Sequence, residues 1–378
     1  MRPVLIRLLL DRPWQTWDAD VQGVPGIGVA LAMTLLGLLA VLWLLWRKGC
    51  QWSAEDRSNV LFWFALVLVL TFVAPLLPAW LANSLPPDPR LPQGQPPEPV
   101  TSVPIFGYGA MVLLGFVAGT WLGQRRAQKA GIDPNLVFDL TFWTLVCGVL
   151  GGRLFYIVQH GDVVFRGADG LWGHLFAAIN LSRGGLVLIG AMLGGAVGFF
   201  GLSQLRQVSA LKLLDLLTPS IFVGIGFGRI GCLLYGCCYG DPSSLPWAVT
   251  FGPESAAFEA LVERGFVLPS APACMPLHPT QIYSSINGFL LALVTLAYYQ
   301  RRRYTGDVFA LGIILYAISR FLIEFVRADE LGQLGTGLTI SQLLALGLLV
   351  VGLTLASWLR WRGARRTTPA ITAAAANS

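Results

Sequence analysis

Charged side chains are scarce in this 378-residue chain. Asp, Glu, Lys and Arg make up 12% of it, whereas 55% of its residues are hydrophobic. A soluble domain carries about a quarter charged residues, so the composition excludes that class. Lysine and histidine are nearly missing, with three residues each. A nucleic-acid-binding protein needs a dense exposed basic face, which a net charge of +6 spread over this length does not supply. We therefore predict a polytopic membrane protein with the lipid bilayer, and no nucleic acid, as its partner.

Long apolar runs divide the chain into candidate membrane spans of about 20 residues, the length that crosses the hydrocarbon core. The nine runs cover residues 27–46, 59–82, 104–123, 136–158, 184–204, 213–235, 280–299, 307–326 and 338–359. The predicted fold class is all-α, a bundle of about nine transmembrane helices. Its expected parts are an N-terminal two-span extension (1–84), a proline-rich periplasmic linker (85–103), a seven-span core (104–360) and a disordered cytoplasmic tail (361–378).

Basic clusters follow alternate spans. They are Arg47 with Lys48, Arg125 with Arg126 and Lys129, Arg206 with Lys212, Arg301–Arg303, and Arg360 with Arg362, Arg365 and Arg366. The positive-inside rule places such clusters in the cytoplasm. This predicts an N-terminus outside and a C-terminus inside. The first residues, MRPVLIRLLLDRPW, carry three Arg on the outer side, and we expect an interfacial amphipathic helix there.

Several charges lie inside the predicted spans, where each costs about 2.5–3.5 kcal/mol on insertion scales. Arg229 lies in the glycine-rich run GIGFGRIGCLLYGCCYG. Arg320, Glu324 and Arg327 follow one another at i, i+4 and i+7, which puts all three on one helical face. An ion pair between Arg320 and Glu324 that neutralises itself is the plainer interpretation. These three residues, however, include two Arg and only one Glu, so one positive charge is in excess.

Two further arginines stand beside glycine pairs. Arg183 precedes Gly184–Gly185 at a span entrance, and the alternative role there is an interfacial anchor. Arg153 lies deeper and needs an internal partner, for which Asp139 and Glu324 are the candidates. Guanidinium groups that converge from several helices would bind phosphate oxygens bidentately. An anionic phospholipid head group is the expected ligand.

His278 begins the segment HPTQIY at the start of a span, beside Gln281 and Tyr283. A histidine with polar neighbours at a membrane boundary is a candidate acid, base or head-group ligand. An ordinary helix-start histidine, with Pro279 in the first turn, fits the same pattern.

Four of the six cysteines lie in the later half of the chain, at Cys232, Cys237, Cys238 and Cys274. The adjacent Cys237 and Cys238 rarely bond to each other for geometric reasons, so a disulfide from one of them to Cys274 is one possibility. Buried thiols are the other. No C-x-x-C spacing and no paired histidine accompany them, so we expect no metal ion.

Seven motifs together resemble the prolipoprotein diacylglyceryl transferase family, over roughly residues 104–360. They are YGAMVLLGF (Tyr108–Phe116), GGR (Gly151–Arg153), RGGL (Arg183–Leu186), GRIGCLLYGCCYG (Gly228–Gly240), HPTQIY (His278–Tyr283), YAISRFLIEFVR (Tyr316–Arg327) and TISQ (Thr339–Gln342). The resemblance implies an enzyme of the bacterial inner membrane. It would transfer the diacylglyceryl group of phosphatidylglycerol to the lipobox cysteine thiol of a prolipoprotein and release glycerol phosphate, without a cofactor.

The resemblance also implies roles for individual residues. Arg229, Arg320 and Glu324 match the family's charged site residues; we expect Arg183 to act electrostatically, with His278 or Glu324 as proton acceptor. Expected substrate-binding residues are Arg153, Tyr108, Gly184, Gly185, Gly231, Gln281, Tyr283 and Arg327. The family signature G-R-x-G-N-F-x-N-x-E-x-x-G is altered here at Cys232, Leu233, Tyr235 and Cys237. A relative that only binds anionic lipid, or moves another lipid group, is therefore the alternative.

Overall fold

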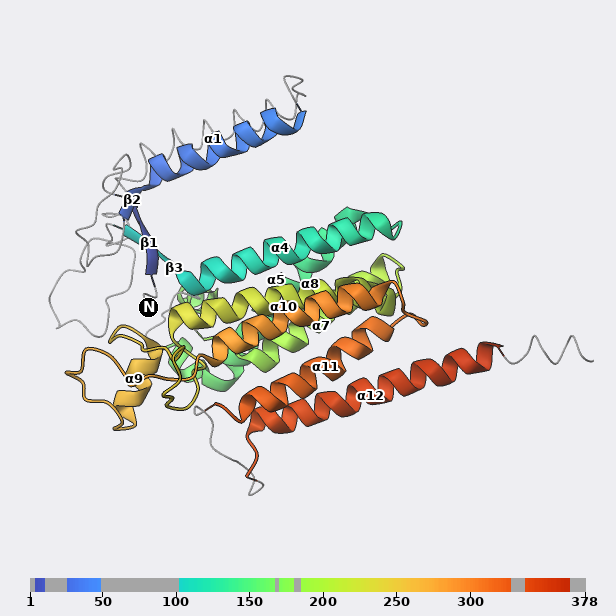
Figure 1. The fold of residues 1–378 in the computed structure, drawn as a ribbon. Helices are drawn as coiled ribbons and strands as arrows, with labels where there is room; N and C mark the ends of the chain where they lie inside the picture. Colours follow the sequence, from blue (N-terminus) through green and yellow to red (C-terminus); the bar gives the residue numbers. More distant parts are fainter. Residues whose placement is uncertain are drawn as a thin grey trace, which may run out of the picture. The chain divides into compact units, whose positions relative to one another are not determined.

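The computed structural model describes residues 4–10, 26–48, 102–166, 170–179, 185–327 and 337–367. Ten helices lie in these ranges (Figure 1), and the predicted helical membrane bundle is thus confirmed as a class. Five of the helices are long and apolar enough to span a membrane by themselves. The span predicted at 59–82 and most of the linker predicted at 85–103 lie outside the described residues, so the total of nine stays a prediction.

The chain divides into two compact units. The smaller one comprises Met1–Ala110, Leu234–Cys237 and Phe251–Cys274. Its described elements are β1 (Val4–Leu9), β2 (Gly26–Gly28), α1 (Val29–Lys48), β3 (Ser102–Phe106) and α9 (Ala256–Glu263). The strands form a sheet in the order β2-β1-β3, with β1 parallel to β2 and antiparallel to β3.

This sheet corrects two expectations. The interfacial helix predicted at the N-terminus is wrong over 4–9, where the chain forms β1, and the fold is accordingly not purely helical. The run Val-Leu-Ile-Arg-Leu-Leu is short and rich in β-branched residues, so it fits a strand as well as a helix. Pairing with β3, about a hundred residues away, satisfies its backbone groups and decides between the two.

The larger unit comprises Met111–Leu233, Cys238–Thr250 and Met275–Ser378. Its helices are α4 (Gly107–Lys129, which begins in the smaller unit), α5 (Pro134–Val164), α6 (Gly170–Ile179), α7 (Leu188–Leu205), α8 (Ala210–Tyr235), α10 (Thr280–Tyr299), α11 (Asp307–Glu324) and α12 (Ile340–Thr367). Figure 1 shows α5, α7, α8 and α10–α12 running along one another. The outward faces of these helices carry exposed Leu, Val and Ile side chains, which suits contact with lipid.

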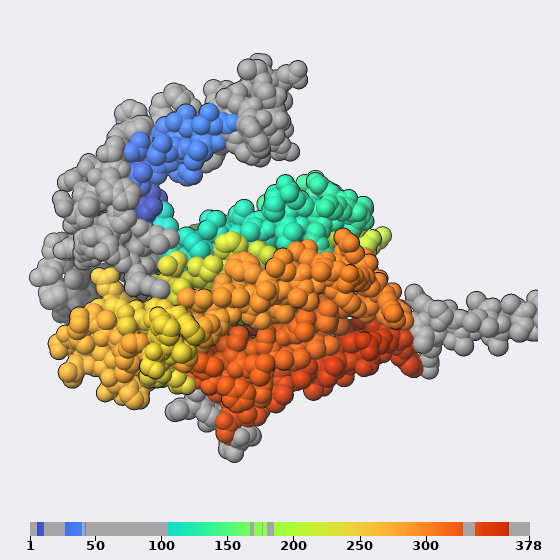
Figure 2. Space-filling view, viewed as in Figure 1, coloured from blue at the N-terminus to red at the C-terminus, as the bar shows by residue number. Residues whose placement is uncertain are grey.

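Several boundaries differ from the predicted spans. The sequence pattern missed the short helices α6 and α9. The α11 helix ends at Glu324, so Arg327 lies beyond it rather than on its face. The α12 helix continues to Thr367, into the segment predicted as a disordered tail, and the rest of that segment lies outside the described residues. Figure 2 shows α11 and α12, in orange and red, packed into one continuous surface.

Glycines join α5 to α7 at close range. A Cβ added to Gly151 of α5 would lie 2.9 Å from the Cα of Gly194 in α7. At Gly198 an added Cβ would lie 2.8 Å from the carbonyl oxygen of Trp143. Side chains longer than hydrogen would push the two backbones apart, so the glycines set the helix separation.

A buried carboxylate fastens α11 to α8. Asp215 in the second turn of α8 accepts the backbone N–H of Gly306 at 2.7 Å and that of Phe309 at 3.0 Å, both at the start of α11. Gly306 has a φ of +107°, a left-handed conformation that favours glycine. Arg302 lies 3.9 Å from the same carboxylate. The two helices therefore begin together and run in the same direction.

Candidate functional site

Glu324, the last residue of α11, is 2% exposed and surrounded by donors. Its carboxylate accepts a hydrogen bond from Arg320, one turn earlier, and lies 3.6 Å from Nη1 of Arg327. The hydroxyl of Thr339 donates to the other carboxylate oxygen at 3.0 Å. The pair foreseen between Arg320 and Glu324 is thus present, but Arg327 joins it. Two guanidinium groups share one carboxylate, so the cluster carries a net positive charge.

Thr339 reaches Glu324 because it also begins α12. Its backbone N–H donates to Oε1 of Gln342 at 3.1 Å, and its hydroxyl accepts the backbone N–H of Gln342 at 3.2 Å. This reciprocal pair is a capping box. It places the positive end of the α12 dipole beside the Glu324 carboxylate, an arrangement that favours negative charge there.

Arg327 lies where three connecting segments meet. It forms a β-bridge with Gly240, whose backbone N–H donates to the carbonyl of His278 at 3.0 Å. The backbone N–H of His278 in turn donates to the carbonyl of Asp241 at 2.9 Å. A Cβ on Gly240 would lie 2.7 Å from the Cβ of His278, so glycine is needed for this approach. Arg327 and His278 are thus linked through the backbone of Gly240, and their predicted roles in one site stay a prediction.

His278 is one of three ring side chains, with Tyr283 and Trp247, that are joined by hydrogen bonds. Its Nδ1 lies 3.3 Å from the hydroxyl of Tyr283, which accepts the indole N–H of Trp247 at 2.8 Å. Gln281, between them in sequence, is 1% exposed. Sequence reasoning missed Trp247, because nothing in the surrounding loop points to it.

Counting residues along α8 and α11 places Arg229 and Arg320 at a similar level on these neighbouring helices. Residue 229 lies fourteen positions after Asp215, and residue 320 lies fourteen positions after Gly306, the residue that Asp215 binds. Fourteen residues of helix rise about 21 Å. Both arginines therefore lie about the same distance along their helices from the contact between Asp215 and Gly306.

The same two arginines also lie on facing sides of their helices. Phe222 of α8 meets Tyr316 of α11, with ring centroids 6.2 Å apart. Arg229 follows Phe222 by seven residues and Arg320 follows Tyr316 by four, spacings that keep a residue on the same helical face. Arg229 makes no hydrogen bond or ion pair with any residue of the described ranges, whereas Arg320 is held by Glu324. One guanidinium is fixed, and the other is available to a ligand.

Arg153 is 8% exposed and binds backbone carbonyls. Its Nε and Nη2 donate to Ala178 and Ala177 at the end of α6, at 2.8 and 2.7 Å, and its Nη1 donates to Gly185 at 3.3 Å. The expected partners were wrong. Asp139 pairs instead with Arg206, at 2.9 Å on the surface, and Glu324 pairs as described above. A helix C-terminus, where carbonyls lack partners, attracts a guanidinium in the same way as a carboxylate does.

The glycines near Arg153 are partly described. Gly185 has a φ of +89°, and an added Cβ would lie 2.7 Å from Cδ1 of Tyr156. Arg183 and Gly184 lie outside the described residues. Gly231 is buried within α8. Tyr108 is 45% exposed and packs edge-on against Tyr235, with ring centroids 6.4 Å apart. Their predicted roles in substrate binding stay predictions.

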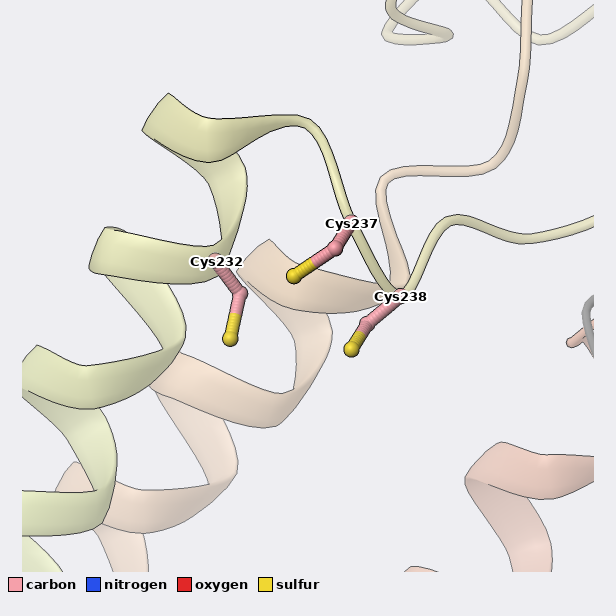
Figure 3. Close-up of side chains that lie close together, drawn as sticks. All are labelled: Cys232, Cys237 and Cys238. Atoms are coloured by element: carbon pink, nitrogen blue, oxygen red, sulfur yellow. The ribbon is translucent and has the colours of Figure 1, made fainter. Parts of the chain in front are cut away.

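Three cysteine sulfur atoms gather at the end of α8, a grouping that the sequence reasoning did not foresee. The Sγ atoms of Cys232, Cys237 and Cys238 all lie within 4.8 Å of one another. Figure 3 shows the three sulfur atoms lying close together beside the end of the helix. The turn between them contains Gly236 and Cys238, both with positive φ, at +81° and +62°. The signal in the sequence was the spacing C-x4-C-C, which becomes a cluster only when the chain reverses after the helix.

Cys274 does not take part in a disulfide, so of the two possibilities the structure shows the free thiol rather than a link to Cys237 or Cys238. Its thiol is buried in a loop and accepts the backbone N–H of Phe251 at 3.2 Å. Burial raises the pKa of Cys274 above its ordinary value, while the Phe251 N–H opposes this shift. Cys274 is therefore a protonated, structural thiol near neutral pH.

An apolar cavity of about 810 Å³ lies among α4, α5, α7 and α8. Its walls are mainly hydrophobic, and small residues such as Gly115, Gly148 and Gly224 widen it. Gly224 lies five residues before Arg229 on α8, about 7.5 Å along the helix. Five residues turn an α-helix by about 140°, so Gly224 and Arg229 project to different sides of the same stretch of α8, the first toward the cavity and the second toward α11.

A sequence model of the prolipoprotein diacylglyceryl transferase family matches residues 99–358, the range that contains every residue of the candidate site described above. The chain belongs to this family. Its transferase relatives include the phosphatidylglycerol–prolipoprotein diacylglyceryl transferase of Clostridium tetani, which is 36% identical over 66% of this chain and 91% of its own length. The transferase of the same name from Nitratidesulfovibrio vulgaris is 35% identical over 68% of this chain and 89% of its own.

A third transferase relative bears on the extra N-terminal residues. The phosphatidylglycerol–prolipoprotein diacylglyceryl transferase of Rhodopirellula baltica is 27% identical, and the match covers 90% of this chain and 87% of that protein. The match therefore extends into the first hundred residues. The extension is a feature that this chain shares with another transferase, although most of it lies outside the described residues.

Proposed function

We propose that this protein transfers the diacylglyceryl group of phosphatidylglycerol to the lipobox cysteine thiol of a prolipoprotein, forming a thioether and releasing glycerol phosphate. The names of its relatives give the donor and the acceptor. The proposal is carried by the pair of arginines that helix geometry places on the facing sides of α8 and α11, together with an apolar cavity that another face of α8 lines. A phospholipid has a complementary division into an anionic head and apolar chains.

The reaction is a substitution at the glycerol carbon that bears the phosphate. The thiol sulfur forms a bond to this carbon, and the carbon–oxygen bond to phosphate breaks. Arg229 and Arg320 stabilise the charge that develops on the leaving phosphate by donating hydrogen bonds to its oxygens. Arg183 and Arg327 add positive charge around the head group, and Arg153, Gly184, Gly185, Gly231 and Tyr108 shape the binding site.

His278 is the proton acceptor that we propose for the thiol. Glu324, the other candidate, already accepts bonds from Arg320 and Thr339 and lies beside Arg327. Its role is to hold Arg320 in place. His278 contacts only Tyr283 through its Nδ1 among the described side chains, and Gln281 lies next to it in sequence. A histidine exchanges protons near neutral pH more readily than any other side chain.

The apolar cavity would hold an acyl chain of the donor, and this gives a size-dependent prediction. Replacing Gly224 with Phe fills the cavity without a clash, because an added Cβ there meets no atom within 4 Å. Displacing about two methylenes costs about 1.6 kcal/mol, so we expect kcat/KM for long-chain phosphatidylglycerol to fall about tenfold, chiefly through KM. Lipidation kinetics with donors of different chain length measure this.

The control for Gly224→Phe is Gly201→Phe on α7, a position that is equally open but does not line the cavity. It should leave kcat/KM unchanged. A short-chain phosphatidylglycerol should also remove the difference between Gly224→Phe and the original protein. An equal loss with short-chain and long-chain donors would contradict the assignment of the cavity.

We further propose that the protein lies in the bacterial inner membrane with its N-terminus outside and its C-terminus in the cytoplasm. The ends of α4 and α10 meet where Arg126 and Arg302 stack on the ring of Tyr299, at 4.2 and 3.7 Å. This end of the larger unit carries the basic clusters, so the positive-inside rule supports a cytoplasmic location. The end with Glu324 and His278 would then face the outer leaflet, where a secreted prolipoprotein arrives.

The decisive experiment incubates the purified protein with phosphatidylglycerol and a lipobox peptide. Mass spectrometry should find the peptide with a thioether-linked diacylglyceryl group, together with free glycerol phosphate in equal amount. A peptide with serine in place of the cysteine is the control and should remain unmodified. Lipid binding without either product would favour the alternative, a relative that has lost or changed the activity.

A further inference from the structure

We propose that Cys232, Cys237 and Cys238 form a three-thiolate Zn²⁺ site whose fourth position takes the thiol of the acceptor peptide. This inference deepens the proposed function, and its second half rests on it. The starting observation is the cluster itself, with all three Sγ atoms within 4.8 Å of one another (Figure 3). Zn–S bonds of about 2.3 Å in tetrahedral geometry place the ligand sulfurs about 3.8 Å apart. Small side-chain rotations bring the three thiols to that spacing.

The local chain is built to bring these thiols together. All three belong to one seven-residue stretch, in which α8 ends and the chain turns back at Gly236. Cys238 has a φ of +62°, which costs a non-glycine residue about 1–2 kcal/mol. The carbonyl of Cys238 accepts the hydroxyl of Thr280 at 2.6 Å, and this bond holds the strained residue in place. Such strain is typical of functional positions.

The ligand set selects the type of ion. Three sulfur ligands favour soft cations such as Zn²⁺ over Mg²⁺ or Ca²⁺, which prefer oxygen. The cluster of His, Cys, Asp and Glu side chains contains no fourth member within the described residues. A zinc ion with three protein ligands and one open position is the arrangement of catalytic rather than structural sites. All three cysteines are only partly buried, so the open position can be reached.

The chemistry of the site matches the need of the proposed reaction. A thiol that binds Zn²⁺ loses its proton, because the metal ion stabilises the thiolate. The peptide thiol would give its proton to His278 and bind as the fourth sulfur ligand. An electron pair of this sulfur then forms the bond to the glycerol carbon, and the pair of the breaking carbon–oxygen bond leaves with the phosphate. No electron is gained or lost by the metal ion.

Arg229 lies close enough to link the two halves of the reaction. It precedes Cys232 by three residues on α8, so both side chains lie on one side of the helix, with Cβ atoms about 5–6 Å apart. A zinc ion with four thiolates carries two negative charges, and the guanidinium offsets part of them. The nucleophile is thereby placed within one helical turn of the group that receives the leaving phosphate.

The test begins with metal binding, measured apart from turnover. The full-length protein, stripped of metal under reducing conditions, is titrated with Co²⁺ as a spectroscopic substitute for Zn²⁺. We expect one Co²⁺ per chain, with the sulfur-to-cobalt charge-transfer band and the visible bands of tetrahedral cobalt. Cys232→Ser and Cys237→Ser should lose these bands. Cys147→Ser in α5 and Cys274→Ser, the matched controls, should keep them. Absence of the bands, or their persistence in both cluster variants, would overturn the site.

The second measurement tests thiol activation. Adding the lipobox peptide to the Co²⁺-loaded protein should change the visible bands, and the serine peptide should not. Removing the metal should lower peptide lipidation about 10²-fold, the usual contribution of proton removal from a nucleophile, and Zn²⁺ should restore it. Unchanged bands with the cysteine peptide would overturn the activation. If the bands change but phosphatidylglycerol gives no product, the metal site stands and the proposed donor or reaction fails.

Discussion

Replacing Arg229 with alanine should lower kcat for diacylglyceryl transfer by about 10²–10³-fold, the usual cost of removing one donor from a developing negative charge. The guanidinium makes no hydrogen bond or ion pair with the described residues, so its removal breaks none of their contacts of these kinds. Thermal unfolding in detergent should therefore be unchanged. A loss of catalysis without a loss of stability is the signature of a group that acts on the substrate. Lipidation kinetics and a melting curve on the same preparation measure both.

Two further variants sharpen this test. Arg229→Lys keeps the positive charge but loses the planar fork that binds two phosphate oxygens, so we expect an activity between those of the original protein and Arg229→Ala. Arg206→Ala removes an arginine from the exposed pair with Asp139 and should leave transfer unaffected. Normal turnover in Arg229→Ala would show that the phosphate is neutralised elsewhere, and the proposed clamp would be wrong.

Replacing Glu324 with alanine should produce the opposite pattern, a large loss of stability together with a loss of activity. The carboxylate is buried and faces Arg320 and Arg327, whose side chains are 15% and 8% exposed. Breaking a buried ion pair by removing one partner costs about 3–5 kcal/mol, because the remaining charge is left uncompensated. The free energy of unfolding, measured by denaturant titration in mixed micelles, should fall by about this amount.

A double-mutant cycle separates the pair from the single residues. Arg320→Ala together with Glu324→Ala removes both charges of the closest pair, so its loss of stability should be smaller than the sum of the two single losses. The exposed pair of Asp139 and Arg206 is the matched control, with side chains 36% and 56% exposed, and Asp139→Ala should cost less than about 1 kcal/mol. Additive losses at Arg320 and Glu324 would mean that the pair is not energetically coupled.

The sequence predicted this cluster because charges inside apolar spans are costly and therefore conspicuous. Arg320 and Glu324 are four residues apart, so their contact follows from helix geometry alone. Thr339 was harder to place, since its contact with Glu324 depends on how the chain returns between α11 and α12. Its spacing to Gln342 nevertheless carries the pattern of a capping box. That pattern could have predicted where α12 begins.

The partner of Arg153 could not have been predicted in the same way. Charge alone predicts an Asp or Glu partner for a buried arginine, whereas Arg153 donates hydrogen bonds to backbone carbonyl groups at the end of α6. The α6 helix was itself not foreseen, because ten residues are too few to register as a span. Every residue has a backbone carbonyl, so residue types do not show which carbonyl will bind a buried cation. A partner of this kind therefore cannot be predicted from the sequence.

The cysteine cluster and β1 were missed for related reasons. Along a continuing helix, Cys232 and Cys237 would project to different sides, and only the reversal at Gly236 brings them together. A positive φ at Cys238 is unusual for a residue with a side chain and is not expected from its type. For β1, the deciding contact lies about a hundred residues away in β3. Local sequence patterns predict neither a cluster formed by a chain reversal nor a strand pairing between distant segments.

The bond between Asp215 and Gly306 restricts how the two helices can change in length. Inserting or deleting one residue between Asp215 and Arg229, or between Gly306 and Arg320, would turn one guanidinium about 100° away from the other and shift it by about 1.5 Å. Substitutions along these segments can be absorbed by repacking, but a change in residue number cannot. Natural variants of this chain should therefore tolerate insertions in the connecting loops and exclude them from these two stretches of fourteen residues.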